Sequence, residues 1–600
     1  MAKGKRKVVS YVNSIDVFRH KCFLLCDLTA NLATVYLCGF SVELNLANAI
    51  DFLNTLAFDK VQHSTKEKRR DGARLLVFVN ELDVLKALIK SRCGEVEPIG
   101  NKERFGFLHI NYLMTDRLLF ANFNVLSNAN ADRVHAMIGK ETKLESCVAL
   151  LDEMSPDWTR IRWSLAHKAQ ADFYRPIAEK IWKETRDHKS LDLKWWYLNI
   201  DIYKAMLAGS AAGLLARFDG KLRERARQVK KDVVSFDKSS AYPSVFVSDD
   251  KFPLGLISEV REKKAEEIVR CVKSGHWFKI FIDTPDPVED LLMFRSPDLS
   301  GYGIDYYDYL ILRRQGKLPV LFQILNSHYE QFHLYTSDYT GFLTDTFRLA
   351  ILKAFSGKAA IKDRSDPRRY YIKTQIDMLF GKGLQRLEAT TTKELNKILR
   401  GRGDKYLRPE HSMHAVSRVR YELFNIVTDI FELGGEVIAF DTDGFKAIDG
   451  DVVRQVIDEA NENERIRLAF ALDQSGATSA EDPPDPEDDS ESDLDLTAES
   501  LLNYGNCGIG QWDLEYRADL FIQIGTKQYV WIDHDTGQLE SKTAGISKLD
   551  FWRAVEKIGK TGEELFDHLA ANRIYFERKR GYIFDPVDEA FDEVRETVEF

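Results

Sequence analysis

The sequence has no long apolar run, no Cys-x-x-Cys pair and no excess of positive charge, and each absence excludes some classes of protein. No stretch approaches the roughly 18 consecutive apolar residues that a membrane-spanning helix needs. No apolar region follows the basic N-terminus, as one would in a secretory signal. The seven cysteines contain no Cys-x-x-Cys pair, so we expect reduced thiols rather than a zinc site or a disulfide framework. These features predict a cytoplasmic protein that is not secreted and makes no membrane contact.

The formal net charge of −10 at pH 7 argues at first against a nucleic-acid partner, but the charge is unevenly distributed. Nine acidic residues and no basic ones lie in 481–495, so the remainder of the chain is close to neutral. Basic residues cluster in 221–231 and 362–373, where they either bind phosphate groups or form solvated helix faces. We expect the acidic stretch within 473–499 to be a disordered linker, because it has too few apolar residues to bury.

The composition is typical of a globular chain with several domains. Of the 600 residues, 44% are hydrophobic and 30% are charged. Hydrophobic periodicity predicts an alternation of strands and helices throughout, with short aromatic-rich strands in 250–345. The expected elements are two strands within 22–40, a strand at 73–79 followed by a helix, a strand at 232–237, paired helices in 346–386, a long helix over 413–433, a strand at 435–444, and strands followed by helices in the last hundred residues.

Three segments carry residue types that suggest chemistry, and the first is SFDKSSAYPS at 235–244. Asp237 ends an apolar strand and is followed by small residues. Such a turn can present a carboxylate beside free backbone N–H groups, which bind anions such as a triphosphate. An aspartate that only caps a strand is the alternative interpretation.

The second segment, FDTDGF at 440–445, places Asp441 and Asp443 one residue apart after an apolar strand. An ordinary Asp-Gly hairpin turn is one interpretation. A calcium-binding loop is excluded, because Phe445 and Lys446 stand where that loop needs Asp or Asn and then Gly.

The third segment, RRYYIKTQIDMLFGKG at 368–383, has Arg369, Lys373, Asp377 and Phe380 at helical spacings. These four residues share one helix face. Cations on such a face can neutralise the charge of a reacting triphosphate. A solvated amphipathic helix is the alternative.

In this order, the three segments resemble the motifs of family B DNA polymerases, which read Asp-x-x-Ser-x-Tyr-Pro, Lys-x-x-x-Asn-x-x-Tyr-Gly and Asp-Thr-Asp-Ser. The chain departs from the pattern at Asp377, Phe380 and Gly444, where Asn, Tyr and Ser are usual. The matching residues are Asp237, Ser240, Tyr242 and Pro243 in the first motif, Lys373 and Gly381 in the second, and Asp441, Thr442 and Asp443 in the third.

The resemblance implies an α/β and α+β multidomain fold, with a ribonuclease-H-like N-terminal domain and a right-hand polymerase of palm, fingers and thumb. It also implies two Mg²⁺ or Mn²⁺ ions at Asp237, Asp441 and Asp443, which would catalyse nucleotide addition. Tyr242 would exclude a ribose 2′-hydroxyl. The nucleotide-binding residues would be Ser240, Tyr242, Arg369, Lys373, Asp377, Phe380 and Gly381.

Further matches point to the protein-primed members of the family, found in bacteriophages and linear plasmids. Lys527 and Tyr529 fit a Lys-x-Tyr motif that holds the primer end, and KTAGIS from Lys542 resembles the segment beyond it. A Gly-x-Trp-x-x-Glu pattern at Gly510, Trp512 and Glu515 precedes both. The implied partners are a DNA primer–template, deoxynucleoside triphosphates and a terminal (priming) protein, and the implied state is a monomer.

The N-terminal region carries an incomplete set of exonuclease residues. The resemblance assigns Asp27, Asp83, Tyr197 and Asp201 to the 3′–5′ exonuclease motifs, but Thr29 stands where the first motif has Glu. Either the exonuclease is degenerate and weak or absent, or another acid replaces the missing one.

These assignments leave two other functions open. A catalytically silent nucleic-acid-binding relative is one, and a template-independent terminal transferase is the other.

The expected domains are an exonuclease-like domain at 1–216, a connector with the first motif at 217–260, a terminal-protein-region-like insertion at 261–345, fingers at 346–390, a second insertion and palm with the third motif at 391–472, the acidic linker at 473–502, the palm end at 503–540 and the thumb at 541–600.

Overall fold

The chain forms two compact units in the computed structural model. The first comprises 1–172, 363–374 and 577–598, and the second comprises 173–362, 375–576 and 599–600. The structure describes residues 22–27, 31–37, 40–46, 48–49, 74–79, 107–114, 117–126, 173–187, 200–207, 214–215, 228–261, 263–295, 301–361, 367–384, 391–395, 408–474, 508–525, 528–543, 548–572, 575–585 and 590–599.

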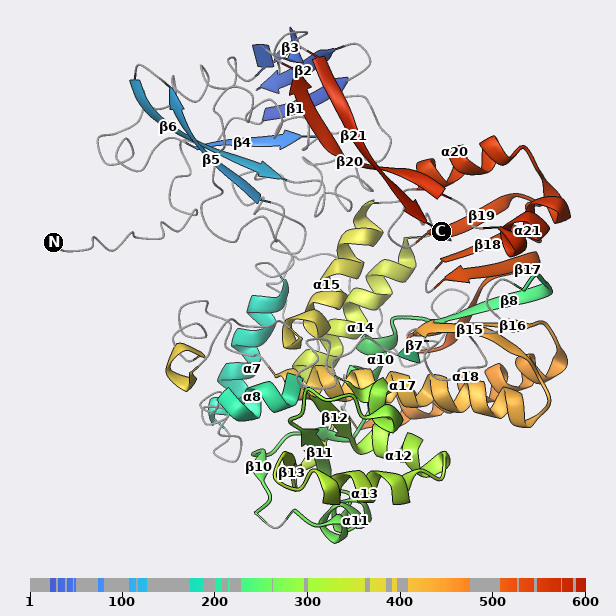
Figure 1. The fold of residues 1–600 in the computed structure, drawn as a ribbon. Coiled ribbons are helices and arrows are strands. Elements are labelled where there is room, and N and C mark those ends of the chain that lie inside the picture. The colour runs from blue at the N-terminus through green and yellow to red at the C-terminus, as the bar shows by residue number, and fades with distance from the viewer. Residues whose placement is uncertain are drawn as a thin grey trace, which may run out of the picture. The chain divides into compact units, whose positions relative to one another are not determined.

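The main element of the first unit is a six-stranded mixed sheet with the order β3-β2-β1-β4-β6-β5 (Figure 1). Strand β4 pairs in parallel with β1 and β6, and all other neighbours are antiparallel. The strands predicted within 22–40 and at 73–79 are confirmed, and the helix expected after them lies outside the described residues. The bounds are β1 Cys22–Asp27, β2 Leu32–Leu37, β3 Phe40–Asn45, β4 Arg74–Val79, β5 Phe107–Met114 and β6 Arg117–Leu126.

The C-terminal residues form a two-stranded hairpin, β20 (Tyr575–Asp585) and β21 (Ala590–Glu599). The prediction that the chain ends in helices is therefore wrong for these residues. Their Glu, Lys and Arg content favours helix by intrinsic propensity. The aromatic and β-branched residues among them instead favour the paired strands.

The second unit is built on a seven-stranded sheet in which every neighbouring pair is antiparallel, with the order β19-β18-β17-β8-β16-β15-β7. The strand predicted at 232–237 is confirmed as β8, which occupies the centre of the sheet. The strand predicted at 435–444 is confirmed as β15, and the tight hairpin expected at Asp441 and Asp443 joins it to β16. The bounds are β7 Leu214–Leu215, β8 Lys230–Lys238, β15 Val437–Thr442, β16 Gly444–Ile448, β17 Trp512–Gly525, β18 Gln528–Asp533 and β19 Leu539–Thr543.

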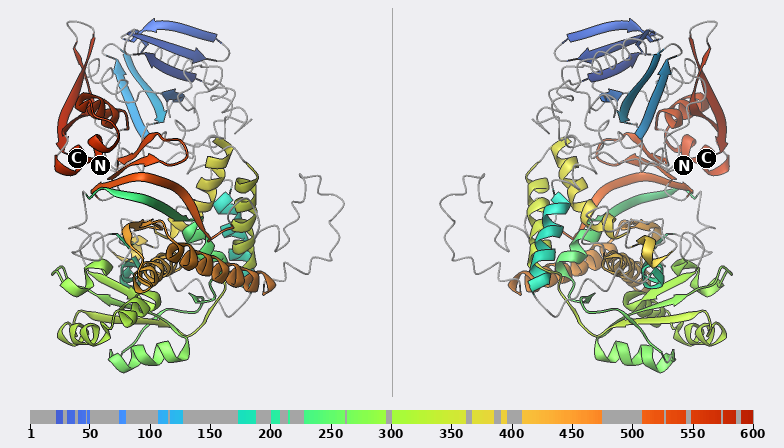
Figure 2. Two further views of the ribbon diagram at one scale, coloured as in Figure 1. Left: turned by 90° about the vertical axis from the view of Figure 1, so that its right-hand side faces the viewer. Right: turned by 90° about the vertical axis from the view of Figure 1, so that its left-hand side faces the viewer.

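Two long helices, α17 (Pro409–Glu432) and α18 (Asp451–Asp473), cover one face of this sheet (Figure 2). Phe236 of β8 belongs to the apolar core between the sheet and these helices. Successive residues of a strand point to opposite faces, so Asp237 faces away from them. The other core residues include Val234, Leu423, Val427, Ile430, Val437, Phe440, Phe445, Val453, Val456 and Trp512.

Residues 258–337 form a separate antiparallel sheet of the second unit, with the order β10-β13-β11-β12 and its own apolar core. Asp305 starts α12 with a capping box that it shares with Asp308, which satisfies the first backbone amides of that helix. The bounds are β10 Ser258–Glu259, α11 Ala265–Ser274, β11 Trp277–Ile282, η7 Glu289–Phe294, β12 Tyr302–Asp305, α12 Tyr306–Arg314, α13 Leu318–Ser327 and β13 Phe332–Ser337.

The remaining elements include the two helices predicted in 346–386, which are confirmed as α14 and α15. None of the helices in the described part of the chain is both long and apolar enough to cross a bilayer. The bounds are α7 Arg175–Asp187, α8 Ile200–Leu207, α10 Ala241–Ser248, β9 Phe252–Pro253, β14 Thr340–Gly341, α14 Asp345–Ala360, α15 Pro367–Gly383, α20 Lys548–Ile558 and α21 Gly562–Ala571.

Candidate active site on the seven-stranded sheet

Two of the predicted catalytic residues lie on neighbouring segments of the seven-stranded sheet. Asp237 is next to last in β8 and pairs with Gly444 of β16. The backbone amide of Lys238 donates a hydrogen bond to the carbonyl of Asp443 over 2.9 Å. Asp441 pairs through its backbone with Gly444, and its side chain lies outside the described part of the structure. The first and third motifs therefore meet.

The hairpin that carries the third motif is tightly turned and lies close to β8. Thr442 has a φ of 65°, which β-branched residues rarely adopt and which is typical of functional sites. A Cβ atom at Gly444 would lie 2.8 Å from the carbonyl oxygen of Phe236 and 2.9 Å from Oδ1 of Asp237. Glycine at 444 thus permits β16 to lie close to β8, which the side chain of the usual serine would obstruct. This gives a physical reason why the third motif has glycine here.

The surroundings of Asp237 raise the pKa of its carboxyl group to about 7. Desolvation by the surrounding protein is the main cause, and the negative charges of Asp443 and Glu515 add to it. Lys446 and Lys542 act in the opposite direction. Asp237 nevertheless remains accessible to solvent. Crowded carboxylates that solvent can reach favour the binding of a cation.

The raised pKa of Asp237 predicts a pH-dependent effect of Asp237→Asn on stability. A carboxyl group whose pKa is higher in the folded than in the unfolded chain destabilises the fold as the pH rises from about 4 towards 7. Without divalent metal, Asp237→Asn should therefore raise Tm above that of the wild type, and by more at pH 8 than at pH 5. Calorimetry in the presence of a chelator measures this difference, and a constant difference across that range would contradict the electrostatic explanation.

Glu515 is a member of this carboxylate group that the sequence patterns did not assign to catalysis. It lies on β17 at an irregularity in the pairing with β8, between Leu514 and Tyr516. Such irregularities redirect side chains. Its Oε2 atom accepts a hydrogen bond from Ser235 Oγ over 3.0 Å. The Gly-x-Trp-x-x-Glu pattern was the available signal, but nothing in it indicates proximity to Asp237.

The turn after Asp237 is held by backbone hydrogen bonds and approached by a lysine. Ser240 has a φ of 49° at the start of α10. The amide of Ser239 donates to Gln511, and that of Gly510 donates to the carbonyl of Ser239, over 2.8 and 2.7 Å. Lys358 of α14 donates from Nζ to Ser240 Oγ over 2.9 Å. Lys358 belongs to none of the sequence motifs, and the structure alone places it here.

The first and second motifs meet through stacked aromatic rings. The rings of Tyr242 and Phe380 lie 4.2 Å apart between centroids and are inclined by 3°. Asp377 is partly exposed one turn earlier in α15, and Gly381 is exposed. Phe380 therefore presents the same flat surface that the usual tyrosine would.

Two predicted triphosphate ligands, Arg369 and Lys373, belong to the first compact unit, whereas the carboxylates belong to the second. Lys373 is exposed and Arg369 is partly exposed. Their predicted contact with a nucleotide stays a prediction.

The predicted primer-binding residues are partly described. Tyr529 is buried and stacks on Phe521, with ring centroids 5.8 Å apart. The amines of Lys446 and Lys542 lie 5.0 and 5.7 Å from the centroid of the Tyr529 ring. Lys542 is exposed, and Lys527 lies outside the described residues. The tyrosine thus supports two lysines close to Asp237, an arrangement that the motif alone does not show.

The predicted exonuclease residues are only partly described. Asp27 is the last residue of β1 in the first unit, and Asp83 and Tyr197 lie outside the described residues. Asp201 lies exposed on α8 of the second unit, where its charge contributes to the raised pKa of Tyr335. Desolvation is the main cause of that shift. The assignment of these residues to an exonuclease stays a prediction.

No model of a known protein family and no curated protein matches the sequence. Solved structures do match it in fold. The fold is similar to that of Phi29 DNA polymerase. A ternary complex of that enzyme with primer-template DNA and incoming nucleotides matches 96% of this chain and 98% of its own, with a TM-score of 0.51 and 10% identity.

Two further structures of Phi29 DNA polymerase agree with this result. Its binary complex with primer-template DNA and its complex with single-stranded DNA each match with a TM-score of 0.52, at 10% and 11% identity. Each match covers 96% of this chain and 99% of the other. At this identity the similarity shows a shared mixed α/β multidomain fold, and the function must be argued from the site.

Proposed function

We propose that the protein is a template-directed DNA polymerase that adds deoxynucleotides to a primer 3′-hydroxyl by two-metal phosphoryl transfer. The observation that carries the proposal is the placement of Asp237 and Asp443 on adjoining segments of the central sheet, next to the stacked pair of Tyr242 and Phe380. The similarity in fold to Phi29 DNA polymerase supports it.

The donor atoms of the site suit Mg²⁺ or Mn²⁺. Carboxylate oxygens are the ligands that these ions prefer. The desolvation and the neighbouring negative charges that raise the pKa of Asp237 would both be offset by a bound cation. Among the residues with described side chains, no three potential ligands form a ready-made metal site, and Asp441 would complete the set. Bound ions would activate the 3′-hydroxyl and stabilise the leaving pyrophosphate.

The residues around the first motif would bind the incoming nucleotide. The stacked rings of Tyr242 and Phe380 offer a flat surface for the sugar and base. The amine of Lys358 of α14 contacts Ser240 at the start of α10, and its positive charge suits a triphosphate bound at the backbone amides there. Arg369 and Lys373 would add charge to the same groups. Lys542, beside Tyr529, would contact the primer strand.

In this proposal the seven-stranded sheet is the palm, α14 and α15 are the fingers, and α20 and α21 belong to the thumb. The separate sheet of residues 258–337 would be the insertion that contacts a terminal protein. The mixed six-stranded sheet would be a ribonuclease-H-like domain with little exonuclease activity, because Thr29 is a poor ligand for a hard cation. If the wild type degraded single-stranded DNA in a metal-dependent reaction that Asp201→Ala abolished, the prediction of little exonuclease activity would be contradicted.

Primer extension by the full chain tests the proposed activity. We expect Mg²⁺-dependent addition that follows the template, from a DNA primer and from the hydroxyl group of a protein primer. Extension without a template would favour a terminal transferase. DNA binding without any extension would favour a catalytically silent relative and overturn the proposal.

Sugar selection by Tyr242 is a direct consequence of this arrangement. Tyr242→Ala should remove the ring that occupies the space of a 2′-hydroxyl, and pockets discriminate single groups of this size by about 10–200-fold. We expect ribonucleotide incorporation to rise by about that factor relative to deoxynucleotides. Tyr242→Phe keeps the ring and should discriminate as the wild type does. Unchanged discrimination in Tyr242→Ala would show that another residue excludes the hydroxyl.

A further inference from the structure

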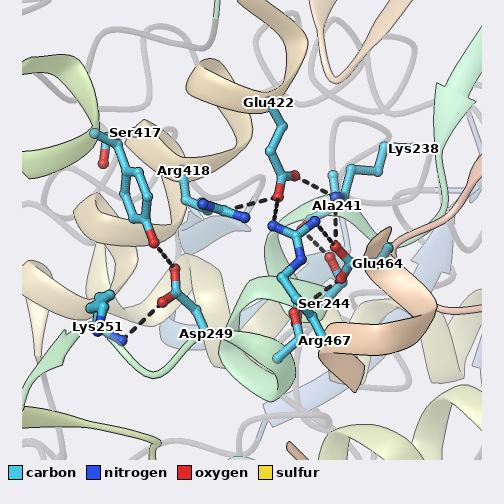
Figure 3. A network of polar contacts seen from close by, with 12 residues as sticks. Lys238, Ala241, Ser244, Asp249, Lys251, Ser417, Arg418, Glu422, Glu464 and Arg467 are labelled. Atoms are coloured by element: carbon cyan, nitrogen blue, oxygen red, sulfur yellow. Dashed lines mark hydrogen bonds and ion pairs between the residues drawn. The ribbon is translucent and has the colours of Figure 1, made fainter. Parts of the chain in front are cut away.

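Figure 3 shows a group of charged residues around Lys238. Lys238 is buried and its neighbour Asp237 is exposed, so the two side chains lie on opposite faces of β8. Lys238 follows Asp237 in β8, and only 2% of its side chain is exposed. Its amine forms a short ion pair with Glu422 of α17 and lies 3.6 Å from Oε2 of Glu464 of α18. Asp237 and Lys238 thus lie on opposite faces of β8: Asp237 is at the proposed metal site, and Lys238 packs among the helices.

Further cations complete this buried group. Arg418 donates from Nε to Glu422 over 2.8 Å, and Arg467 lies 2.9 Å from the same carboxylate. Arg467 also pairs with Glu464. The two glutamates therefore have several partners each, and Figure 3 shows both with these cations around them. A buried charge without such partners would destabilise the fold strongly.

The geometry identifies Glu422 as the main partner of Lys238, because Glu422 accepts a hydrogen bond from the lysine amine whereas Oε2 of Glu464 lies 3.6 Å from it. Desolvation lowers the pKa of Lys238, but the charges of Glu422 and Glu464 outweigh it, so that the pKa is raised. Desolvation raises the pKa of Glu422, but Lys238 and Arg418 outweigh it, so that this pKa is lowered. The pKa of Glu464 is raised, because its desolvation is not fully offset by Lys238. The directions of these pKa shifts agree with the contacts.

The backbone of Lys238 connects this buried group to both catalytic aspartates. Lys238 is bonded to Asp237 through the peptide, and its amide donates to the carbonyl of Asp443 over 2.9 Å. Glu464 also contacts α10, because the hydroxyl of Ser248 in that helix donates a hydrogen bond to its Oε1 atom over 3.0 Å. A shift of the Lys238 side chain would therefore displace both aspartates together.

We infer that Lys238 is a positioning residue, whose ion pair with Glu422 fixes the spacing of Asp237 and Asp443. The inference rests on the proposed polymerase function. An apolar side chain could fill the same space at equal or greater stability, so stability alone gives no reason for buried charges here. Ion pairs differ from apolar contacts in fixing direction and distance, which is what two carboxylates that share metal ions require.

The test compares Lys238→Met, which keeps the apolar stem and removes the charge, with the double variant Lys238→Met/Glu422→Gln. The double variant removes one charge of each sign and leaves Arg467 paired with Glu464, so its Tm should lie above that of Lys238→Met. We expect kcat for single-nucleotide addition to remain about 10²-fold low in both variants, as is usual for displaced catalytic groups. The KM for nucleotide and the Kd for primer–template should change little. The rise in Tm caused by Mg²⁺, which does not depend on turnover, should shrink.

Arg420→Met is the matched control. Arg420 is a buried cation of α17, the helix that carries Glu422, and it pairs with Asp308 of α12 over 2.9 Å rather than with a residue of β8. The control variant should lower Tm and leave kcat unchanged at temperatures well below Tm. A double variant with kcat within about twofold of wild type would overturn the inference, whatever its Tm. Absence of templated extension by the wild type would instead refute the proposed function, and the inference with it.

Discussion

Asp237→Asn and Asp443→Asn should each lower the rate of templated nucleotide addition by at least about 10³-fold, because metal ions supply several kcal/mol of transition-state stabilisation and each 1.4 kcal/mol is tenfold in rate. Asparagine keeps the shape of the side chain but not the charge that holds a divalent cation. Asp237 is accessible to solvent, and the substitution removes a charge that its neighbours repel. The variants should therefore fold.

Single-turnover primer extension with Mg²⁺ measures this loss, and fluorescence anisotropy measures primer–template binding. Binding should change by less than about threefold, because contacts with DNA phosphates elsewhere supply most of the affinity. Asp519→Asn is the control, since Asp519 is an exposed acid of β17 that pairs with His534 over 2.6 Å. Retention of more than about a tenth of the wild-type rate by either catalytic variant would exclude two-metal transfer at these residues.

The strands that carry Asp237, Asp441 and Asp443 could be predicted from the sequence because their signals are local. An apolar run that ends in an acid, and two acids one residue apart before glycine, specify a strand end and a hairpin without knowledge of the rest of the fold. That the two segments become neighbours could not be derived from their own residues. The expectation came from the order of the motifs, and the structure shows the pairing of β8 with β16.

Glu515 and Lys358 could not be placed from the sequence, because their roles depend on tertiary contacts alone. Glu515 reaches the carboxylates through an irregularity between β17 and β8, and such irregularities leave little trace in composition. Lys358 is one of several lysines in its region, and only its hydrogen bond to Ser240 distinguishes it.

Lys238 is a residue whose sequence context suggests exposure to solvent, although the structure shows it buried. A lysine at the end of a strand is normally a solvated residue. Here it is buried because Glu422 and Glu464, which lie far away in the sequence, provide compensating charge. Burial of a charge depends on partners from other elements, so no local pattern could indicate it.

Restoring the usual family residue at Gly444 should impair the enzyme rather than improve it. Gly444→Ser would place a Cβ atom 2.8 Å from the carbonyl oxygen of Phe236 and 2.9 Å from Oδ1 of Asp237. Contacts below 3.0 Å do not persist, so β16 must move away from β8 or Asp237 must rotate. A displacement of about 1 Å at a catalytic group costs about 10²-fold in rate, and we expect a loss of kcat of that order.

Gly450→Ser is the matched control, because Gly450 follows the same hairpin and a Cβ atom there would meet nothing within 4 Å. Its backbone is extended, with a φ of 178°, at the N-cap position of α18, where serine is favourable. The control should keep wild-type kcat and Tm, whereas Gly444→Ser should lose kcat with little change in primer–template Kd. Equal rates for the two variants would show that the hairpin tolerates a side chain next to Asp237, and the close approach of β16 to β8 would then not be required for catalysis.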